Sequence, residues 1–525
     1  MKKESLNFKT GFVILLILGV AVFFRFYDIK NTPPGLYPDE AVNGVNALEA
    51  LKTGDFKVFY PENNGREGLF MNIQALSLKI LGAQAWALRI VSGVFGALTV
   101  LGLFLLVRTL WSDRLALLAS YLMAVSFWPV NFSRIGFRAI MLPFVLVWTF
   151  YFLWKGFIDK KVGWVALAGL VYGIGFHTYI SWRVSPLLIV LIFIMLLFIK
   201  HRVFDKKFVF KSLFVFGIGA IITMSPLLLY YVRQPADFLG RAVQVSIFNS
   251  PSPAQALTES IVKTLGMFNI YGDGNWRHNL AGRPELFWPI GIGFLIGLIY
   301  TIRHPMSLKN YFLITWFFVM LLPNFLAPQG APHALRALGA LPAVFILSAI
   351  GLNKIYTKIQ ARFDDYLADI KNKPRIGQIK RIKKELAVLA FVLLIFTGVW
   401  EWRNYFAVWA VQPEVSGNFD QRLTDIGNYL KDLPADTKKY VIVNEGDVFI
   451  KNIPVQAQPI IFLNFKNQDE ISFITSDKIA SIPKNLVNAV IIPTKRDPSL
   501  SNYILNEYPQ ARWADFITFK ALKIK

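Results

Sequence analysis

The chain has 525 residues, of which 54% are hydrophobic and 17% are charged, and it contains no cysteine. An average globular domain has about 45–50% apolar and about 25% charged residues, so this composition argues against a soluble enzyme and favours a membrane protein. The formal net charge of +23 is expected either of a nucleic-acid-binding protein or of basic cytoplasmic loops. The absence of cysteine excludes disulfides, thiolate metal sites and cysteine nucleophiles.

Eleven apolar stretches are candidates for membrane spans, because about 20 apolar residues cross a bilayer as a helix. The first stretch has a basic start but no small-residue cleavage site, so we interpret it as a span rather than a cleaved signal peptide. The predicted spans cover residues 11–27, 86–107, 115–130, 139–158, 164–180, 184–199, 212–232, 286–302, 311–326, 335–352 and 386–401.

The charges of the loops predict an orientation. With the N-terminus in the cytoplasm, the inner loops hold 25 basic and eight acidic residues, and the segment 353–385 supplies ten of the basic ones. Basic residues gather in cytoplasmic loops, so we expect a protein of the cytoplasmic membrane with its C-terminus outside. Most of the excess charge is then explained without nucleic acid. The segment 353–385 is interpreted as a partly helical cytoplasmic segment lying against anionic lipid.

Two domains are predicted: a membrane domain over 1–401 and a small outer α/β domain over 402–525. Within the first, two long outer loops cover about 28–85 and 233–285. In the tail, amphipathic and short apolar segments alternate, which is typical of a small α/β fold. The expected tail elements are a helix near 418–433, apolar runs at 440–443, 459–462 and 489–492, a helix near 499–507 and a final run near 513–519.

The first outer loop contains a helix start that carries two carboxylates. Pro33 and Pro34 end the first span, and Pro38-Asp39-Glu40 precedes helix-forming residues. Acids in a first turn stabilise the helix N-terminus, which is the structural interpretation of both residues. Because neighbouring helical side chains point about 100° apart, one carboxylate would face a site while the other caps or orients. Asp39 is therefore a candidate general base for an acceptor hydroxyl.

A second polar cluster, Asn63-Asn64-Gly65-Arg66-Glu67, precedes an amphipathic stretch at 69–81. The two amphipathic helices of this loop are expected to lie in the membrane interface. Arg66 either contacts lipid headgroups or clamps a phosphate, since guanidinium binds phosphate oxygens bidentately. Asn64 and Glu67 are candidate substrate-binding residues.

These features together resemble the GT-C glycosyltransferases. The stretches Tyr37–Ala41, Asn63–Glu67 and Ala87–Arg89 are similar to bacterial members of the dolichyl-phosphate-mannose protein mannosyltransferase-like family (glycosyltransferase family 39) and to the transferase that adds aminoarabinose to lipid A. The resemblance covers about residues 1–410. It implies a polytopic α-helical membrane fold with about eleven spans, and transfer of a sugar from a polyprenyl-phosphate carrier to an acceptor on the outer face of the cell envelope.

The resemblance also implies roles for individual residues. Asp39 matches the family's proposed base or acceptor ligand, and Arg66 matches the basic residue that contacts the carrier phosphate. Glu40 would orient the acceptor or the loop. For Arg138, headgroup anchoring and binding of the anionic donor are both open, and the resemblance favours the donor. Arg336 lies in a Pro-His-Ala-Leu-Arg stretch like one in the family, and it either snorkels to the interface or contacts the phosphate.

Two further outer segments supply candidates. His177, at the end of a predicted span, is either a hydrogen-bonded packing residue or a substrate contact. In the second long loop, glycines flank Asp273 and are followed by Trp276 and His278, which is typical either of a loop that covers a sugar or carrier site or of a structured turn. Because carboxylate and imidazole are both metal ligands, Asp273 and His278 are also candidates for a divalent cation; the sequence indicates no certain cofactor.

The sequence thus predicts an inverting membrane glycosyltransferase whose partners are a polyprenyl-phosphate-linked sugar, membrane lipids and a protein, lipid or glycan acceptor. Three alternatives compete. A transporter or flippase of lipid-linked saccharides would place ionisable residues within its spans, an O-antigen ligase or polymerase would act on long glycans, and a receptor or scaffold would depend on the tail alone. Arginines are expected mainly in cytoplasmic loops. Their presence in the predicted outer loops, together with one Asp-Glu pair, favours the transferase.

Overall fold

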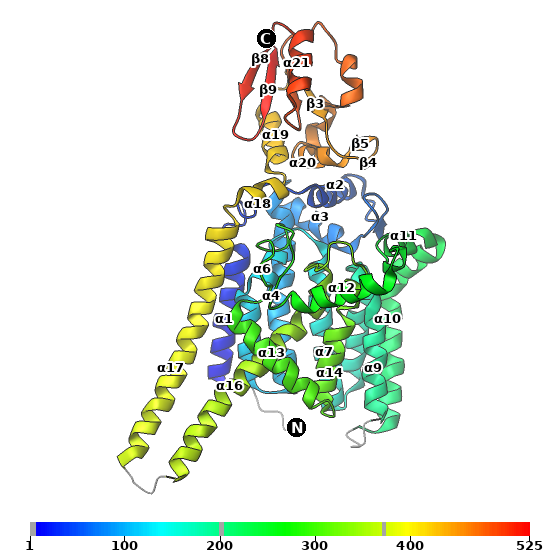
Figure 1. Cartoon of the computed structure of the whole chain (residues 1–525). Coiled ribbons are helices and arrows are strands. Elements are labelled where there is room, and N and C mark those ends of the chain that lie inside the picture. Colours follow the sequence, from blue (N-terminus) through cyan, green and yellow to red (C-terminus); the bar gives the residue numbers. More distant parts are fainter. Residues whose placement is uncertain (1–6, 199–203, 370–373, 525) are drawn as a thin grey trace. The chain divides into compact units, whose positions relative to one another are not determined.

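The computed structural model describes residues 7–198, 204–369 and 374–524. It divides into two compact units (Figure 1). The helical unit comprises Met1–Tyr27 and Ser92–Trp409, and the α/β unit comprises Asp28–Val91 and Ala410–Lys525. Of the basic residues counted in the predicted cytoplasmic loops, those at 2, 3, 200, 202, 371 and 373 lie outside the described residues.

The helical unit is built from long apolar α-helices joined by short helical turns. A π-helix covers Arg403–Trp409, and 3₁₀ turns include η1 (Arg138–Ile140), η2 (Gly175–His177), η3 (Ile180–Val184), η4 (Ile247–Asn249) and η5 (Arg336–Ala340). The α-helices are α1 (Phe8–Phe26), α4 (Ala85–Leu110, which begins in the α/β unit), α5 (Asp113–Val125), α6 (Phe127–Phe132), α7 (Met141–Asp159), α8 (Val162–Ile174), α9 (Ser185–Phe198), α10 (Lys206–Arg233), α11 (Pro235–Gln244), α12 (Pro253–Gly266), α13 (Trp288–Arg303), α14 (Leu308–Val319), α15 (Leu322–Phe325), α16 (Leu341–Asp369) and α17 (Pro374–Trp402).

Within the described part of the chain, seven helical segments are long and apolar enough to cross a membrane. They are Phe8–Phe26, Ala85–Leu110, Arg138–Asp159, Ile180–Phe198, Lys206–Arg233, Leu308–Phe325 and Arg336–Asp365. The spans predicted at 164–180 and 286–302 correspond to shorter apolar helices, Val162–His177 and Trp288–Arg303. These helices agree with a polytopic membrane protein, while the count of eleven and the orientation stay predictions.

Close helix pairs in this unit depend on glycine. A Cβ atom on Gly297 of α13 would lie 1.9 Å from the carbonyl oxygen of Leu347, and one on Gly351 of α16 would lie 1.8 Å from the carbonyl oxygen of Gly293. The backbones of α13 and α16 are therefore in direct contact. Small residues at helix crossings allow this approach, which supplies the packing that holds helices together in lipid.

The α/β unit combines residues 28–91, which include the predicted first outer loop, with the tail. Its central sheet has the strand order β6-β3-β7-β9-β8, in which β3 is parallel to β6 and β7, while β9 is antiparallel to β7 and β8. Its α-helices are α2 (Pro38–Thr53), α3 (Leu69–Leu81), α18 (Pro413–Asn418), α19 (Gln421–Asp432), α20 (Gln458–Leu463) and α21 (Pro498–Glu507). Its strands are β1 (Phe59–Tyr60), β2 (Arg66–Glu67), β3 (Lys438–Val443), β4 (Phe449–Ile450), β5 (Ile453–Pro454), β6 (Ile471–Thr475), β7 (Ala489–Pro493), β8 (Arg512–Asp515) and β9 (Lys520–Ile524), and its 3₁₀ turns are η7 (Val455–Ala457), η8 (Phe465–Glu470) and η9 (Ser476–Ser481).

The predicted small α/β tail is confirmed, although the prediction for one of its elements is wrong. The helices near 418–433 and 499–507 and the strands at 440–443 and 489–492 are present as α19, α21, β3 and β7. The apolar run at 459–462, which we expected among the β-rich runs, is the helix α20. A short run that is buried along its whole length has no periodicity to separate helix from strand, and Pro459 in its first turn is compatible with a helix start.

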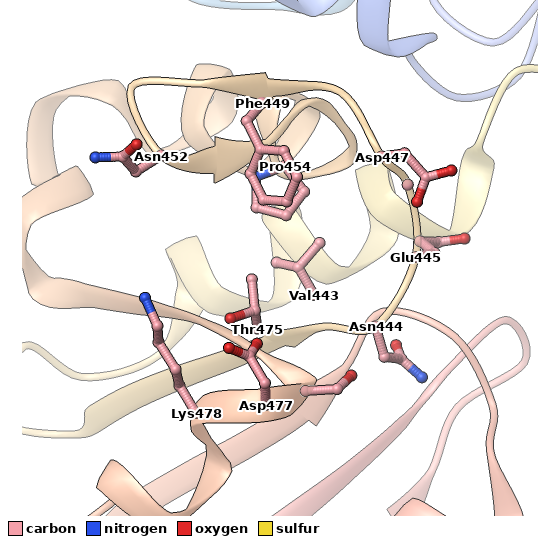
Figure 2. A pocket seen from close by; sticks show the side chains of 12 residues that line it. Val443, Asn444, Glu445, Asp447, Phe449, Asn452, Pro454, Thr475, Asp477 and Lys478 are labelled. Atoms are coloured by element: carbon pink, nitrogen blue, oxygen red, sulfur yellow. The ribbon is translucent and has the colours of Figure 1, made fainter.

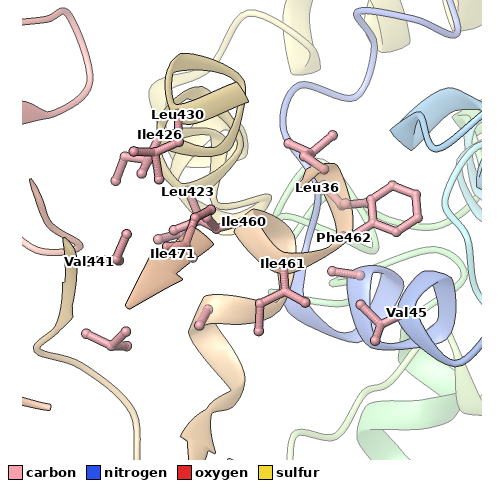
Figure 3. Packing of buried hydrophobic residues seen from close by; sticks show 14 of the residues in the cluster. Leu36, Val45, Leu423, Ile426, Leu430, Val441, Ile460, Ile461, Phe462 and Ile471 are labelled. Carbon is pink, nitrogen blue, oxygen red and sulfur yellow. The ribbon is translucent and has the colours of Figure 1, made fainter. Parts of the chain in front are cut away.

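One hydrophobic core joins the first outer loop to the tail. It includes Leu36 and Val45 from the loop region and Leu423, Ile460 and Phe462 from the tail (Figure 3). Within this core the ring of Phe462 lies on α2, where a Cβ atom on Gly44 would approach the ring to 2.5 Å. The first outer loop is therefore held by packing against the domain that begins more than 300 residues later in the chain.

Phe462→Ala is expected to destabilise this unit by about 3–5 kcal/mol, because it removes a fully buried ring and leaves a cavity beside Gly44. The loss of stability would be measured by denaturant unfolding of the full chain in detergent, with protease cleavage within 54–67 as the signal for unfolding of this unit. Ile517→Ala is the matched control, since Ile517 is 99% exposed. Equal stability of the two variants would contradict the packing described here.

Candidate functional site

The predicted site residues fall into both units. The α/β unit holds Asp39, Glu40, Asn64, Arg66 and Glu67, while the helical unit holds Arg138, His177, Asp273, Trp276, His278 and Arg336.

Asp39 lies in the first turn of α2. Tyr37 is extended and Pro38 occupies the start of the helix, where a fixed φ is favourable and no amide N–H is needed. The carboxylate of Asp39 is partly exposed, and its Oδ1 accepts a hydrogen bond of 2.6 Å from Nδ2 of Asn63. Asn63 has a φ of 51°, a left-handed conformation that asparagine tolerates. Asp39 is thus oriented by a neighbouring turn and by the positive end of a helix.

Glu40, the next residue, is fully buried and paired with Arg89. Nε and Nη2 of Arg89 donate to the two carboxylate oxygens of Glu40 at 3.1 and 3.0 Å. Arg89 also donates to the carbonyl oxygens of Pro33 at 2.6 Å and Gly35 at 2.7 Å. Both carboxylate oxygens of Glu40 are therefore used inside the protein, and the contacts fasten the segment that leads into α2. Of the two roles expected for Glu40, this arrangement favours orienting the loop.

Arg66 is buried in the short hairpin β1–β2. Its Nη1 donates to Oδ1 of Asn43 at 2.6 Å, and its Nη2 donates to Oδ1 of Asn46 at 2.7 Å. The two asparagines lie three residues apart on α2, so they face the same side of that helix. A phosphate contact through these nitrogens would require exchange of both bonds. The predicted clamp by Arg66 stays a prediction, and the observed bonds connect the hairpin to α2.

The turn between the two hairpin strands supplies the remaining candidates of this unit. Asn63, Asn64 and Gly65 all have positive φ values, of 51°, 65° and 74°. Gly65 is required there, because a Cβ atom would lie 2.6 Å from the ring of Phe59. Asn64 is exposed at the turn, whereas Glu67 is buried. Asn64 is therefore accessible to a ligand and Glu67 is an interior residue.

Three candidates of the helical unit lie on different turns. Arg138 begins η1, with its guanidinium 5.6 Å from the ring centroid of Tyr179. Arg336 begins η5 and donates from Nη1 to the carbonyl oxygens of Ala327 and Gln329 at 2.6 and 2.7 Å. Both arginines are partly exposed. His177 is buried, with its Nε2 2.9 Å from the carbonyl oxygen of Thr223, as expected of a packing histidine.

The loop after α12 brings Asp273 and His278 together. Nδ1 of His278 lies 2.8 Å from Oδ2 of Asp273, and the backbone amide of Ala334 donates to the same oxygen at 2.8 Å. His333 is adjacent, with its ring centroid 4.9 Å from that of His278. Asp273, His278 and His333 each offer a ligand atom, and these atoms lie within 4.8 Å of one another. Trp276 is partly buried, and its carbonyl oxygen accepts a bond of 2.8 Å from the indole of Trp409.

The charges around this triad follow from burial and from the neighbouring groups. Burial alone would raise the pKa of Asp273, but the hydrogen bond from His278 and the two imidazoles outweigh it and lower that pKa. Burial lowers the pKa of His333 well below its usual value, and His278 and Arg336 add to the effect. Burial, together with the charge of Asp273, raises the pKa of Glu285 well above its usual value. An ionised aspartate beside a neutral imidazole is a suitable donor set for a divalent cation.

Three residues of these arrangements were not predicted as members. Arg89 stands out in the sequence only as part of the family-like stretch at 87–89, and no local signal indicates that it pairs with Glu40. His333 lies in the family-like stretch that ends at Arg336, but nothing local indicates that it joins Asp273 and His278. Glu285, whose Oε1 accepts a bond of 2.9 Å from the amide of Asp273, carries no sequence signal.

Comparisons with known proteins agree with this architecture. Residues 69–230 match the family model described as dolichyl-phosphate-mannose-protein mannosyltransferase. The putative mannosyltransferase YkcB of Bacillus subtilis (strain 168) is 26% identical over 186 residues, which are 34% of this chain and 24% of that protein. The chain therefore matches only about a quarter of the length of this curated relative.

Two solved structures share the fold. ArnT from Cupriavidus metallidurans, bound to undecaprenyl phosphate, matches with a TM-score of 0.58 and 14% identity over 98% of each chain. The archaeal oligosaccharyltransferase AglB from Archaeoglobus fulgidus, in complex with an inhibitory peptide and a dolichol-phosphate, matches with a TM-score of 0.55 and 13% identity over 93% of this chain and 69% of that chain. The helical membrane fold and the family resemblance predicted from the sequence are confirmed.

Proposed function

We infer that this chain, an integral membrane protein with the GT-C fold and a segment of the dolichyl-phosphate-mannose-protein mannosyltransferase type, is an inverting glycosyltransferase. It takes a sugar from a polyprenyl-phosphate carrier and passes it to an acceptor hydroxyl. The main structural support for placing the reaction at Asp39 is its position: it is partly exposed in the first turn of α2, and Asn63 orients its carboxylate.

The reaction requires one bond to form and one to break at the anomeric carbon. The acceptor oxygen attacks that carbon and gives its proton to Asp39, while the bond to the phosphate oxygen breaks and the electron pair leaves with the phosphate. Because attack and departure occur on opposite faces, the configuration inverts. A phosphate is a good leaving group, so a carboxylate within reach of the acceptor hydroxyl is a sufficient base.

The departing phosphate requires neutralisation, which is often the largest catalytic contribution. We assign this role first to Arg138 and Arg336, because both residues are partly exposed in the helical unit. Arg66 is the weaker candidate, since it is buried and both of its terminal nitrogens donate to asparagine side chains, whereas only Nη1 of Arg336 donates to the carbonyl oxygens described above. Asn64 and Trp276 remain proposed substrate contacts, whereas the buried ring of His177, bonded to Thr223, favours the packing role.

The transfer assay uses the full chain in proteoliposomes with radiolabelled polyprenyl-phosphate sugars and, in parallel, nucleotide sugars. We expect polyprenyl phosphate to be released only with the lipid-linked donors. Movement of intact lipid-linked saccharide across the bilayer without release would favour the flippase alternative and overturn the transferase.

We further propose that Asp273, His278 and His333 hold a divalent cation, which would fix the loop after α12 rather than take part in transfer. Three N/O donors are typical of zinc sites. We therefore expect the full chain, stripped with chelator and then supplied with Zn²⁺, to bind about one ion per chain, as measured by elemental analysis. His333→Ala should lose the ion. His304→Ala is the control, since His304 is exposed and lies outside the triad. Equal zinc content in both variants would exclude this site.

A further inference from the structure

The α/β unit contains a pocket whose lining includes none of the predicted site residues. It lies at the carboxyl ends of the parallel strands β3 and β6 and has a volume of about 510 Å³ (Figure 2). Small-molecule sites have volumes of about 300–1,000 Å³, and the carboxyl edge of parallel strands is where open α/β sheets bind ligands. Both the place and the size are therefore those of a binding site.

Three segments form the wall of this pocket. The loop after β3 contributes Asn444 and Asp447, the hairpin β4–β5 contributes Phe449 and Asn452, and the turn after β6 contributes Asp477. Gly446 fixes the first loop, because it has a φ of 87° and a Cβ atom there would lie 1.9 Å from Oε1 of Gln456. Figure 2 shows the ring of Phe449 against Pro454, its partner in the hairpin.

The charge of the wall disfavours phosphate-bearing ligands, which often bind at such an edge. Three carboxylates, of Glu445, Asp447 and Asp477, face one ammonium group, that of Lys478. Glu445 is paired with Arg422 at 2.6 Å, and the hydroxyl of Thr475 lowers the pKa of Asp477, which keeps it ionised. Like charges repel, and no glycine-rich phosphate loop follows β3. A nucleotide or another phosphate-bearing ligand is therefore disfavoured.

The same wall suits a polyhydroxylated ligand. Carboxylates accept short, strong hydrogen bonds from hydroxyls, and the amides of Asn444 and Asn452 both donate and accept. Phe449 is 54% exposed, so its ring offers apolar surface to the C–H face of a sugar and π-electrons to an ammonium group. Acids, amides and one aromatic ring together match a neutral or amino-bearing saccharide.

The hairpin β4–β5 and the turn after it pack against α2, the helix that contains Asp39. Ile450 and Val455 pack against Val42, which follows Asp39 by three residues, or about 4.5 Å along the helix axis. Nζ of Lys451 pairs with Glu49 of the same helix at 2.6 Å. The wall of the pocket and the proposed base are thus fixed to one rigid element.

We propose that this pocket binds a neutral or amino-bearing saccharide and serves as the recognition site for the acceptor. Naming the ligand as the acceptor rests on the proposed transfer function, whereas saccharide binding does not. The acceptor class left open by the sequence is thereby narrowed to a glycan or a glycan-bearing molecule.

The test is saturation-transfer difference NMR on the full chain in nanodiscs. The probes are mannotriose, the disaccharide of glucosamine, trigalacturonate and ATP at equal concentration. We expect signals from the first two probes only. Phe449→Ala should weaken their binding about fivefold, as expected from loss of one ring contact, and Asp447→Ala should act in the same direction, most on the glucosamine disaccharide.

Two surface variants control for changes outside the pocket: Val448→Ala, beside Phe449 but not in the wall, and Asp469→Ala, an exposed acid elsewhere in the unit. Both should bind as the wild type does. Absence of binding by both expected probes, equal binding by Phe449→Ala, or preference for ATP or trigalacturonate would overturn the proposal. Asp39→Asn should retain full binding, so failure of transfer and failure of this pocket are distinguishable.

Discussion

Asp39→Asn is expected to lower the rate of sugar transfer by about 10²–10⁴-fold, the usual contribution of a positioned general base. The amide has the shape of the carboxylate but does not accept the acceptor's proton. Asp39 is partly exposed, and its Oδ1 accepts a hydrogen bond from Asn63 that an asparagine oxygen would also accept, so the substitution should leave the fold intact. Initial rates in proteoliposomes with a polyprenyl-phosphate sugar measure the effect, together with donor affinity, which should stay within about twofold.

The matched control is Asp55→Asn in the same outer loop. Asp55 lies past the end of α2 and its side chain is 66% exposed, so the variant should transfer at the wild-type rate. A wild-type rate for Asp39→Asn would remove Asp39 as the base. A loss of donor affinity as large as the loss of rate would reassign it to donor binding.

Arg89→Met is expected to destabilise the chain by about 3–5 kcal/mol, because it leaves the buried carboxylate of Glu40 without its partner. The side chains of Arg89 and Glu40 are 1% and 0% exposed, so water does not replace the lost bonds. The substitution also removes the donors to Pro33 and Gly35. Thermal unfolding in detergent, with protease cleavage of the outer loop as a second readout, measures the loss.

Two further variants separate a structural pair from a catalytic one. Arg512→Met, an exposed arginine of β8, should be neutral. Glu40→Gln combined with Arg89→Met should be less destabilising than the sum of the two single changes, because no charge is left buried. If Arg89→Met were as stable as the wild type yet inactive per folded molecule, the pair would act directly on substrate and our interpretation of Glu40 would be wrong.

Local sequence patterns predicted the elements that carry the site. The proline before Asp39 and the spacing of apolar residues over 69–81 placed α2 and α3, because capping and helical periodicity are properties of neighbouring residues. The pattern did not show which carboxylate would be buried. Glu40 is buried because it pairs with Arg89, which lies 49 positions away in the chain. Tertiary packing, and not the local sequence, determines such a partner.

The same limit applies to the other clusters. Asn43 and Asn46 are visible as a pair on one helical face, but nothing local shows that Arg66 binds them. His333 joins Asp273 and His278 from a different part of the chain. The packing of the first outer loop with the tail depends on Gly44 meeting Phe462, a contact that amphipathicity alone does not specify.

Binding of polyprenyl phosphate to the purified full chain, measured by native mass spectrometry, tests the central claim most directly, because it requires knowledge of neither the sugar nor the acceptor. The account predicts about one polyprenyl phosphate per chain, reduced by Arg138→Ala and Arg336→Ala, and no binding of the uncharged polyprenol at the same concentration. Equal binding of the phosphate and the alcohol, or binding of neither, would contradict a transferase that uses a polyprenyl-phosphate donor.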